Sequence, residues 1–406
     1  MADAIQLSEP VKKPLTPAPG RCTILPGMTP AFRAISFLLV AMAAAAAPRA
    51  RQLGVPFDGT TGKLNAITDV AGVEVGHKTL VSGAGSQAVR TGVTAVWPRG
   101  KQTGAPPVFG AWFSLNGNGE MTGTTWVEES GLLDGPVMIT NTHSVGVVRD
   151  SYIKWSVARA RKAGIDISDQ WSLPVVAETW DGHLNDINGF HVTEPDVDAA
   201  LESAAPGPVA EGNVGGGTGM VCYGFKGGIG TSSRRTGDYT VGVLVQCNCG
   251  RRAQLRIAGV PVGQEIPGNE PYALGPRGDE DLGSIIIVVA TDAPLLPHQM
   301  KRLARRASLG LARTGSISGN GSGDIFIAFS TANADAGRAS GLVKVTMLPN
   351  DAMNGIFEAT VQATEEAIVN AMVGAETMTG FEGHQVMALP HDQLRKVLEK
   401  YGRLSR

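Results

Sequence analysis

The chain has 406 residues, of which 43% are hydrophobic and 18% charged, and its formal net charge at pH 7 is -2. This near balance of charge argues against a nucleic-acid partner and against an anionic membrane surface. The 53 glycines and the aromatic content of 5% favour a sheet-rich α/β protein with close backbone approaches over a helical bundle.

We interpret residues 1–53 as an N-terminal extension. Within it, residues 28–48 combine a basic flank, an apolar run of about 14 residues and an alanine-rich end, a pattern typical of a secretory signal peptide and too short to span a bilayer. If this segment acts as a signal, we expect a periplasmic or secreted protein that has no membrane association after processing. If it is only a disordered or helical extension, we expect a cytoplasmic protein.

Residues 54–406 contain no long linker, charge run or repeat, which predicts a single domain. β-Branched content and flanking glycine or proline predict strands at 109–115, 136–140, 173–180, 239–248, 284–291 and 324–330. Apolar residues at helical spacing predict helices at 150–163, from Pro297 onward and from about Asn354 onward. Helices around a sheet-rich centre suggest two sheets packed face to face with helices outside.

Several motifs have ordinary interpretations. The four cysteines, Cys22, Cys222, Cys247 and Cys249, predict no disulfide framework, and we interpret Cys247 and Cys249 as packing residues on one face of a strand. Neither metal nor cofactor is expected, because the group Asp181, His183, Asp186, His191 and His143 matches no strong metal motif. The glycine-rich stretches 213–220 and 226–234 lack a nucleotide-binding pattern and predict close backbone approaches. Residues 116–120 could form tight turns or a pocket wall.

The junction at Ser284 is the strongest candidate for chemistry. A hydrophilic stretch, residues 275–283, runs directly into a very apolar strand that begins with this serine. The pattern alone also fits an ordinary strand-start serine. If the preceding bond is strained, however, the hydroxyl can attack the Gly283 carbonyl, and hydrolysis of the resulting ester frees the α-amine of Ser284. Such an amine, with a pKa of about 7.7–8.0, can accept the hydroxyl proton, so no histidine is required.

The run from Gly283 to Thr331, with residues 63–80, resembles the family of L-aminopeptidase/D-alanine-esterase/amidases and β-peptidyl aminopeptidases. The resemblance extends from about residue 54 to the C-terminus. It implies a four-layer αββα sandwich of the N-terminal-nucleophile-hydrolase kind, and a precursor cut before Ser284 into chains 54–283 and 284–406. It further implies substrates with a free N-terminus (small peptides, amides or esters of L-residues, D-alanine or β-amino acids) and a homo-oligomer, a tetramer of processed units.

The same resemblance assigns roles to five further residues. Ser322 and Asp324 stand where the family places a serine and an acidic residue around the nucleophile, although some relatives carry glutamate there. Asn248 corresponds to the oxyanion asparagine, and Glu178 to the carboxylate that pairs with the substrate ammonium group. Trp180 stands where a tyrosine is expected, and an indole presents no phenol. From the residues alone, an Asx-type turn at 322–324 and an ordinary strand-end asparagine at 248 remain open.

The sequence is compatible with three functions. The first is a self-cleaving serine aminopeptidase with Ser284 as nucleophile. The second is a related N-terminal-nucleophile acyltransferase, which passes the acyl group to an amine instead of water. The third is a non-enzymatic binding protein on the same sandwich, which predicts an uncut chain.

Overall fold

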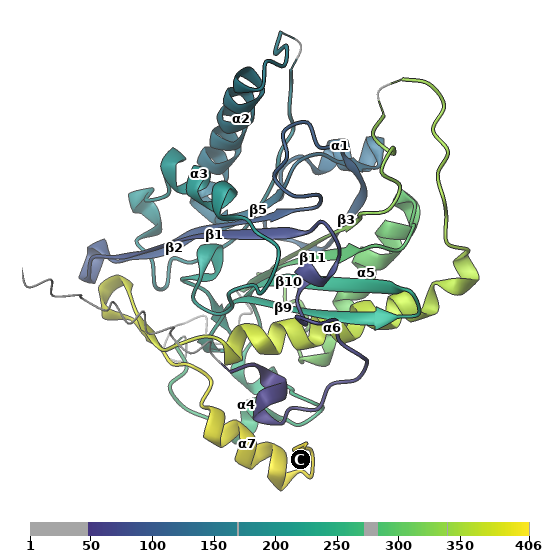
Figure 1. The fold of residues 1–406 in the computed structure, drawn as a ribbon. Coiled ribbons are helices and arrows are strands. Elements are labelled where there is room, and N and C mark those ends of the chain that lie inside the picture. Colours follow the sequence, from purple (N-terminus) through teal and green to yellow (C-terminus); the bar gives the residue numbers. More distant parts are fainter. Residues whose placement is uncertain (1–47, 169, 272–282, 339, 406) are drawn as a thin grey trace, which may run out of the picture. The chain divides into compact units, whose positions relative to one another are not determined.

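The computed structural model describes residues 48–168, 170–271, 283–338 and 340–405 (Figure 1). Residues 28–47 of the predicted signal segment, Cys22 and residues 275–282 lie outside these ranges, so the structure does not test those predictions. Among the described residues, no helix has both the length and the apolar character needed to cross a membrane.

Two β-sheets pack face to face, and helices cover both outer faces (Figure 1). The larger sheet has the order β4 (Leu132–Leu133), β3 (Val108–Gly117), β12 (Gly323–Ser330), β11 (Ser284–Thr291), β10 (Tyr239–Asn248), β9 (Gly228–Thr236). The smaller has the order β1 (Glu74–Ser82), β2 (Val89–Trp97), β5 (Val137–Asn141), β6 (Val175–Thr179). The outer helices are α2 (Val145–Lys162) and α3 (Glu194–Ser203) on the smaller sheet, and α5 (Pro297–Arg313) and α6 (Asn354–Val373) on the larger.

The remaining elements are short and lie around this sandwich. They are α1 (Thr124–Ser130), α4 (Val262–Glu265), α7 (His391–Lys400) and two small hairpins, β7 (Val221–Cys222) with β8 (Phe225–Lys226) and β13 (Met378–Thr379) with β14 (Gln385–Val386).

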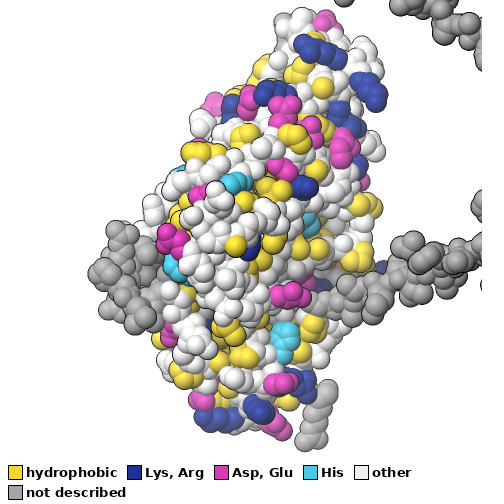
Figure 2. All heavy atoms as spheres, turned by 90° about the vertical axis from the view of Figure 1, so that its left-hand side faces the viewer, with side chains coloured by type: hydrophobic (Ala, Val, Ile, Leu, Met, Phe, Trp, Pro, Cys, Tyr) yellow, Lys and Arg dark blue, Asp and Glu magenta, His cyan; other side chains and the backbone are white. Residues whose placement is uncertain are grey.

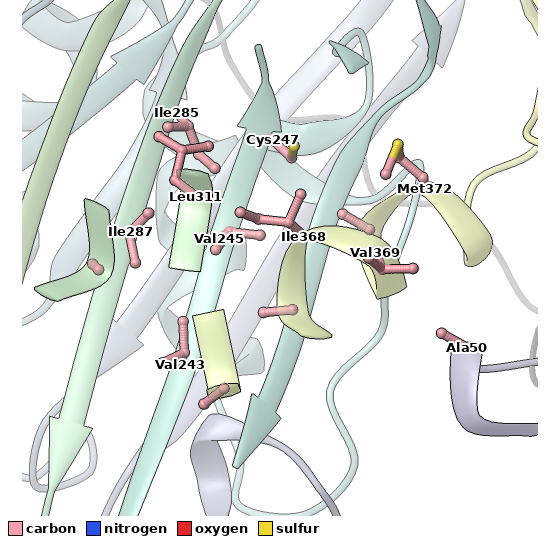
Figure 3. Close-up of a cluster of buried hydrophobic side chains, with 14 of the residues drawn as sticks. Ala50, Val243, Val245, Cys247, Ile285, Ile287, Leu311, Ile368, Val369 and Met372 are labelled. Atoms are coloured by element: carbon pink, nitrogen blue, oxygen red, sulfur yellow. The ribbon is translucent and has the colours of Figure 1, made fainter. Parts of the chain in front are cut away.

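Alternation along β11 explains why its sequence is apolar throughout. Ile285 and Ile287 face α5 and α6, where they pack with Val243, Leu311 and Ile368 (Figure 3). Ile286 and Val288 face the smaller sheet and belong to the core between the two sheets. A strand buried on both faces needs apolar residues at every position, not only at alternate ones. The four predicted layers, helix, sheet, sheet and helix, are thereby confirmed.

The predicted strands all exist, and the bounds of β10 and β11 agree with the prediction. The helices from Pro297 and Asn354 are also confirmed. The start predicted at Asp150 is wrong, because α2 begins at Val145 and follows a short 3-10 turn. Asp150 instead forms an ion pair with Lys154 one turn later, on the exposed side of the helix. Its carboxylate therefore supports the helix from within rather than capping it.

The glycine-rich stretches do bring backbones together. A Cβ on Gly217 would lie 2.5 Å from the amide nitrogen of Ile229, and one on Gly230 would lie 2.0 Å from the carbonyl oxygen of Ala367. Neither position could hold a larger residue without moving the neighbouring backbone. The prediction of close packing, rather than a phosphate cradle, matches this geometry.

The packed unit begins before residue 54, which was the predicted domain boundary. Ala50 is fully buried in the core, Arg49 forms an ion pair with Glu211, and Arg51 forms one with Glu366. Sequence composition cannot show this, because the anchoring carboxylates lie far away in the chain.

On the face shown in Figure 2, basic and acidic side chains are interspersed.

The cysteines depart from the prediction. Cys222 and Cys247 form a disulfide, whereas no disulfide was expected. Sequence spacing suggested only the pair Cys247 and Cys249, but β7 brings Cys222 against β10 from 25 residues earlier in the chain. Cys249 is buried, with its Sγ 3.9 Å from that of Cys247.

Candidate active site

The predicted nucleophile lies where three strands end side by side. In register, Ser284 at the start of β11 pairs with Asn248 of β10 on one side and with Gly323 of β12 on the other. The Gly323 amide donates a hydrogen bond to Ser284 Oγ over 3.2 Å. Ser284 is 6% exposed, so its hydroxyl is held in a mostly buried position with one side still open.

Gly283 fits the space before the nucleophile only because it lacks a side chain. A Cβ at this position would lie 2.2 Å from the Asn248 carbonyl oxygen and 2.5 Å from Cys249 Cα. Both neighbours are backbone atoms, so neither could move aside without distorting β10. The structure thus gives a steric reason for glycine immediately before Ser284.

The side-chain amide of Asn248 is oriented by two backbone groups. Its Oδ1 accepts a hydrogen bond from the Val221 amide over 2.7 Å, and its Nδ2 donates one to the Trp180 carbonyl over 3.0 Å. A primary amide carries two N–H donors, so the second can donate to a reacting oxygen. Trp180 therefore orients the Asn248 side chain through its backbone carbonyl and not through its indole.

Ser322 and Asp324 flank the glycine that donates to the nucleophile. Both side chains are fully buried, and Ser322 Oγ donates to Asp324 Oδ1 over 2.6 Å. The loop before them is held by amide side chains: Asn116 donates to the carbonyls of residues 318 and 319, and Asn118 to that of Gly321. Asn116 and Asn118 thus support the loop that carries this pair.

Glu178 is a buried carboxylate with neutral hydrogen-bond donors. It is 4% exposed, and it accepts hydrogen bonds from the Glu120 amide over 2.9 Å and from the Thr142 hydroxyl. Burial raises the pKa of Glu178, and these two hydrogen bonds only partly oppose that effect. A cation that entered beside it would be attracted strongly, because the surroundings screen charge poorly.

A cleft of about 410 Å³ connects the carboxylate to the nucleophile. Its lining residues are Asn118, Gly119, Glu120, Thr142, Glu178, Trp180, Ser284 and Gly321. Ser284, Glu178 and Trp180 were predicted from the sequence, and Trp180 is 41% exposed. A second cleft of the same volume lies between residues 97–106 and α2, and it contains none of the predicted site residues.

Sequence reasoning missed Thr142, Gly321 and Val221. Thr142 follows β5 and offers only a hydroxyl, and Val221 acts through its amide, so no side-chain pattern marks either of them. Gly321 falls inside the glycine-rich run before Ser322, and that run was the one available indication that the loop approaches the site.

The aspartates and histidines near residue 181 have separate partners. Asp186 bonds His191, Asn185 donates to Asp181, and His183 stacks on His384. Burial raises the pKa of Asp181 to about 7. In the described part of the chain, the cysteines at 222, 247 and 249 are the one group of potential ligand residues close enough to share an ion, and the Cys222–Cys247 disulfide leaves only the Cys249 thiol among them.

Comparison with known proteins agrees with this architecture. Residues 65–386 match the model of peptidase family S58. A β-peptidyl aminopeptidase of Sphingosinicella microcystinivorans is 55% identical over 91% of this chain and 96% of its own length, and one of Sphingosinicella xenopeptidilytica is 49% identical over 92% and 96%.

Solved structures extend the comparison. The L-aminopeptidase D-Ala-esterase/amidase of Ochrobactrum anthropi, described as a prototype for the serine aminopeptidases and a variant of the Ntn hydrolase fold, superposes with a TM-score of 0.83, at 49% identity over 88% of this chain and all of that one. A Burkholderia β-aminopeptidase gives 0.78, at 46% identity over 87% and 99%. Fold and site thus define a serine aminopeptidase of the N-terminal-nucleophile hydrolase type. The chain belongs to peptidase family S58.

Proposed function

We propose that this chain cleaves itself before Ser284 and then, as a two-chain enzyme, releases N-terminal residues from short peptides, amides and esters. One observation carries the proposal: a single cleft is lined by both Ser284 and the buried carboxylate of Glu178, and Ser284 pairs in register with Asn248. The first pair suits acyl transfer, and the carboxylate suits a free ammonium group.

Self-cleavage begins with attack of Ser284 Oγ on the Gly283 carbonyl carbon. The hydroxyl proton passes to the amide nitrogen of Ser284 as the C–N bond breaks, which leaves an ester between Gly283 and the hydroxyl oxygen and frees the α-amine of Ser284. Water hydrolyses the ester and restores the hydroxyl. The backbone of residues 248 and 249 leaves no room for a Cβ at Gly283, and we expect this confinement to keep the Gly283 carbonyl beside the nucleophile.

In the processed enzyme the α-amine of Ser284 accepts the hydroxyl proton as Oγ attacks the substrate carbonyl. The second N–H of Asn248 stabilises the resulting oxyanion, and the leaving amine takes the proton. Water then hydrolyses the acyl-enzyme. Ser322 and Asp324, hydrogen-bonded to each other beside Gly323, hold the strand that positions the nucleophile. Glu178 restricts cleavage to the first residue because it binds only a free terminal ammonium group.

For substrates, the relatives' names support both β-aminoacyl and L-aminoacyl compounds, with some acceptance of D-alanyl esters and amides. A panel of L-, D- and β-aminoacyl p-nitroanilides measures the preference. We expect turnover of small L- and β-residues, and an activity confined to internal peptide bonds would overturn the proposal. The same assay with an added amine shows whether water or the amine accepts the acyl group.

Export to an oxidising compartment and assembly into a tetramer of processed units are further parts of the proposal. Export is supported by the signal-like pattern of residues 28–48 and by the Cys222–Cys247 disulfide, a bond that persists in such compartments. Fractionation of the native host and light scattering of the purified protein test the two statements.

The test of the nucleophile is Ser284→Ala, with Ser330→Ala as the matched control. Ser330 is a buried serine at the opposite end of β12. Intact mass spectrometry of the wild-type protein and the control should find a chain that begins at Ser284. Ser284→Ala should remain uncut and lose at least about 10⁴-fold in kcat. A folded Ser284→Ala protein that is cut or active would refute the proposal, as would a fully active wild-type chain that stays intact.

A further inference from the structure

A covalent link lies directly behind Asn248. Cys222 ends β7, Cys247 precedes Asn248 in β10, and their sulfurs form the disulfide described above. Each cysteine is the chain neighbour of one partner in the hydrogen bond from the Val221 amide to Asn248 Oδ1. We propose that this disulfide holds Val221 against Asn248 and thereby fixes the side-chain amide with its nitrogen toward the reacting carbonyl. The inference rests on the proposed function.

Orientation matters because the two ends of a side-chain amide have nearly the same shape and opposite polarity. With its nitrogen toward the substrate, Asn248 donates to the oxyanion, whereas a flipped amide would place an oxygen there and repel it. Only an oxygen can accept from the Val221 amide, and only a nitrogen can donate to the Trp180 carbonyl. Both contacts therefore select the same orientation, and loss of the Val221 contact removes one of the two.

Three sets of contacts stabilise the hairpin that carries Val221. The disulfide attaches Cys222 to β10, and the Tyr223 amide donates to the Cys249 carbonyl over 2.7 Å. The third set involves Lys226, which pairs with Val221 across the hairpin and is fully buried. Its Nζ donates to the carbonyls of Met220 over 2.8 Å and Gly227 over 2.9 Å. Met220 immediately precedes Val221, so the buried amino group of Lys226 holds the segment that presents the critical amide.

The disulfide lies one residue from the nucleophile's register partner in the larger sheet. Cys247 pairs in register with Ile285, and Asn248 with Ser284. Figure 3 shows Cys247 and Ile285 at the same end of neighbouring strands. A change in the cysteine link therefore acts one residue from the site, without removing any group that contacts substrate. Cys222 and Cys247 are accordingly positioning residues.

The experiment compares Cys222→Ser with Cys249→Ser in the full-length chain. Peptide mapping of unreduced wild-type protein should find the segments of Cys222 and Cys247 linked. Cys222→Ser should lower kcat about 10-fold to 100-fold, less than removal of an oxyanion donor, and slow self-cleavage, while KM stays within about twofold because Glu178 is unchanged. Cys249→Ser lies outside the link and should retain wild-type kcat.

A double mutant distinguishes positioning from a general loss of structure. If Cys222 acts through Asn248, then Cys222→Ser should lose most of its effect on kcat in the Asn248→Ala background. Should Cys222→Ser fail to fold, the folded wild-type enzyme is treated with a phosphine, which reduces the disulfide to two thiols as it is oxidised; kcat should fall and return on reoxidation.

Three results would overturn the proposal: an unlinked wild-type protein, an unchanged kcat after loss of the link, or an effect of equal size in the Asn248→Ala background. A wild-type enzyme that is cut and active but indifferent to Cys222→Ser refutes only this inference. An active Ser284→Ala protein would refute the proposed function itself.

Discussion

Glu178 and Glu366 are both buried carboxylates, yet their surroundings differ in one respect. Glu366 accepts hydrogen bonds from two cations, Arg234 at 2.6 Å and Arg51 at 2.9 Å, and from Asn65. Burial alone would raise the pKa of Glu366, but the guanidinium groups outweigh that effect and lower it. Within the described residues, Glu178 accepts hydrogen bonds only from neutral donors, and burial raises its pKa.

The comparison separates a structural carboxylate from one built for a ligand. A carboxylate that serves the fold receives its cations from the chain itself, because an unpaired buried charge is costly. A carboxylate that serves binding leaves the cation position open to the substrate. Mutations at the two positions should therefore affect different measurements, stability in one case and substrate binding in the other.

The largest effect is expected at Glu366. Its removal in Glu366→Ala leaves the fully buried Arg234 without its counterion, which should lower the free energy of unfolding by about 3–5 kcal/mol in denaturant titrations. The control is Glu365→Ala, since that residue pairs with the half-exposed Arg313 and should contribute about 1 kcal/mol or less. Equal losses at the two positions would contradict the structural role of Glu366.

Next in size is Asn248→Ala, which removes the proposed oxyanion donor. We expect kcat to fall about 100-fold to 1000-fold, equivalent to about 2.7–4 kcal/mol, with little change in KM. The same variant leaves the Val221 amide and the Trp180 carbonyl without partners, so unfolding should also become easier by about 1–3 kcal/mol. Steady-state kinetics with a β-aminoacyl p-nitroanilide measures the first effect, and an unchanged kcat would remove Asn248 from the mechanism.

Glu178→Gln should change binding rather than folding. Loss of the charge should raise KM for substrates with a free N-terminus about 10-fold to 100-fold, or about 1.5–3 kcal/mol. The free energy of unfolding should stay the same or rise, because a buried charge without a counterion has been removed. Glu128→Gln, on an exposed ion pair with Lys301, is the control for KM. A large loss of stability in Glu178→Gln would show instead that Glu178, like Glu366, serves the fold.

The smallest effect is the pH dependence of stability, for which the two carboxylates predict opposite signs. Because the pKa of Glu178 is raised, the folded state binds the proton of this carboxyl group more tightly than the unfolded state does. The contribution of Glu178 to the free energy of unfolding is therefore greatest at low pH and is lost as pH rises through the raised pKa. The lowered pKa of Glu366 gives stability that is present at neutral pH and lost as pH falls. Between about pH 4 and 7, the free energies of unfolding of Glu178→Gln and Glu366→Gln should therefore depart from that of the wild type with opposite pH dependence.

Much of the scaffold was predictable because its evidence lies in consecutive residues. The apolar run 284–291 predicted both ends of β11, β-branched content predicted the neighbouring strand β10, and helical spacing predicted the two helices of the larger sheet. The change from hydrophilic residues to this strand also located Ser284 and its glycine. Where the pattern was weaker, at the start of α2, the prediction was wrong.

The sequence by itself determined six of the strands, the layers and the position of Ser284, because local composition, hydrophobic spacing and backbone preference are properties of neighbouring residues. It did not predict β1, β2 or β9. Only the tertiary structure decided which groups surround that serine: the Val221 amide and the Trp180 carbonyl reach Asn248 from 27 and 68 residues away, and β7 brings Cys222 to Cys247. These contacts use backbone atoms or pair side chains across the fold. Every residue carries the same backbone groups, so no pattern along the chain marks the ones that the folded protein will use.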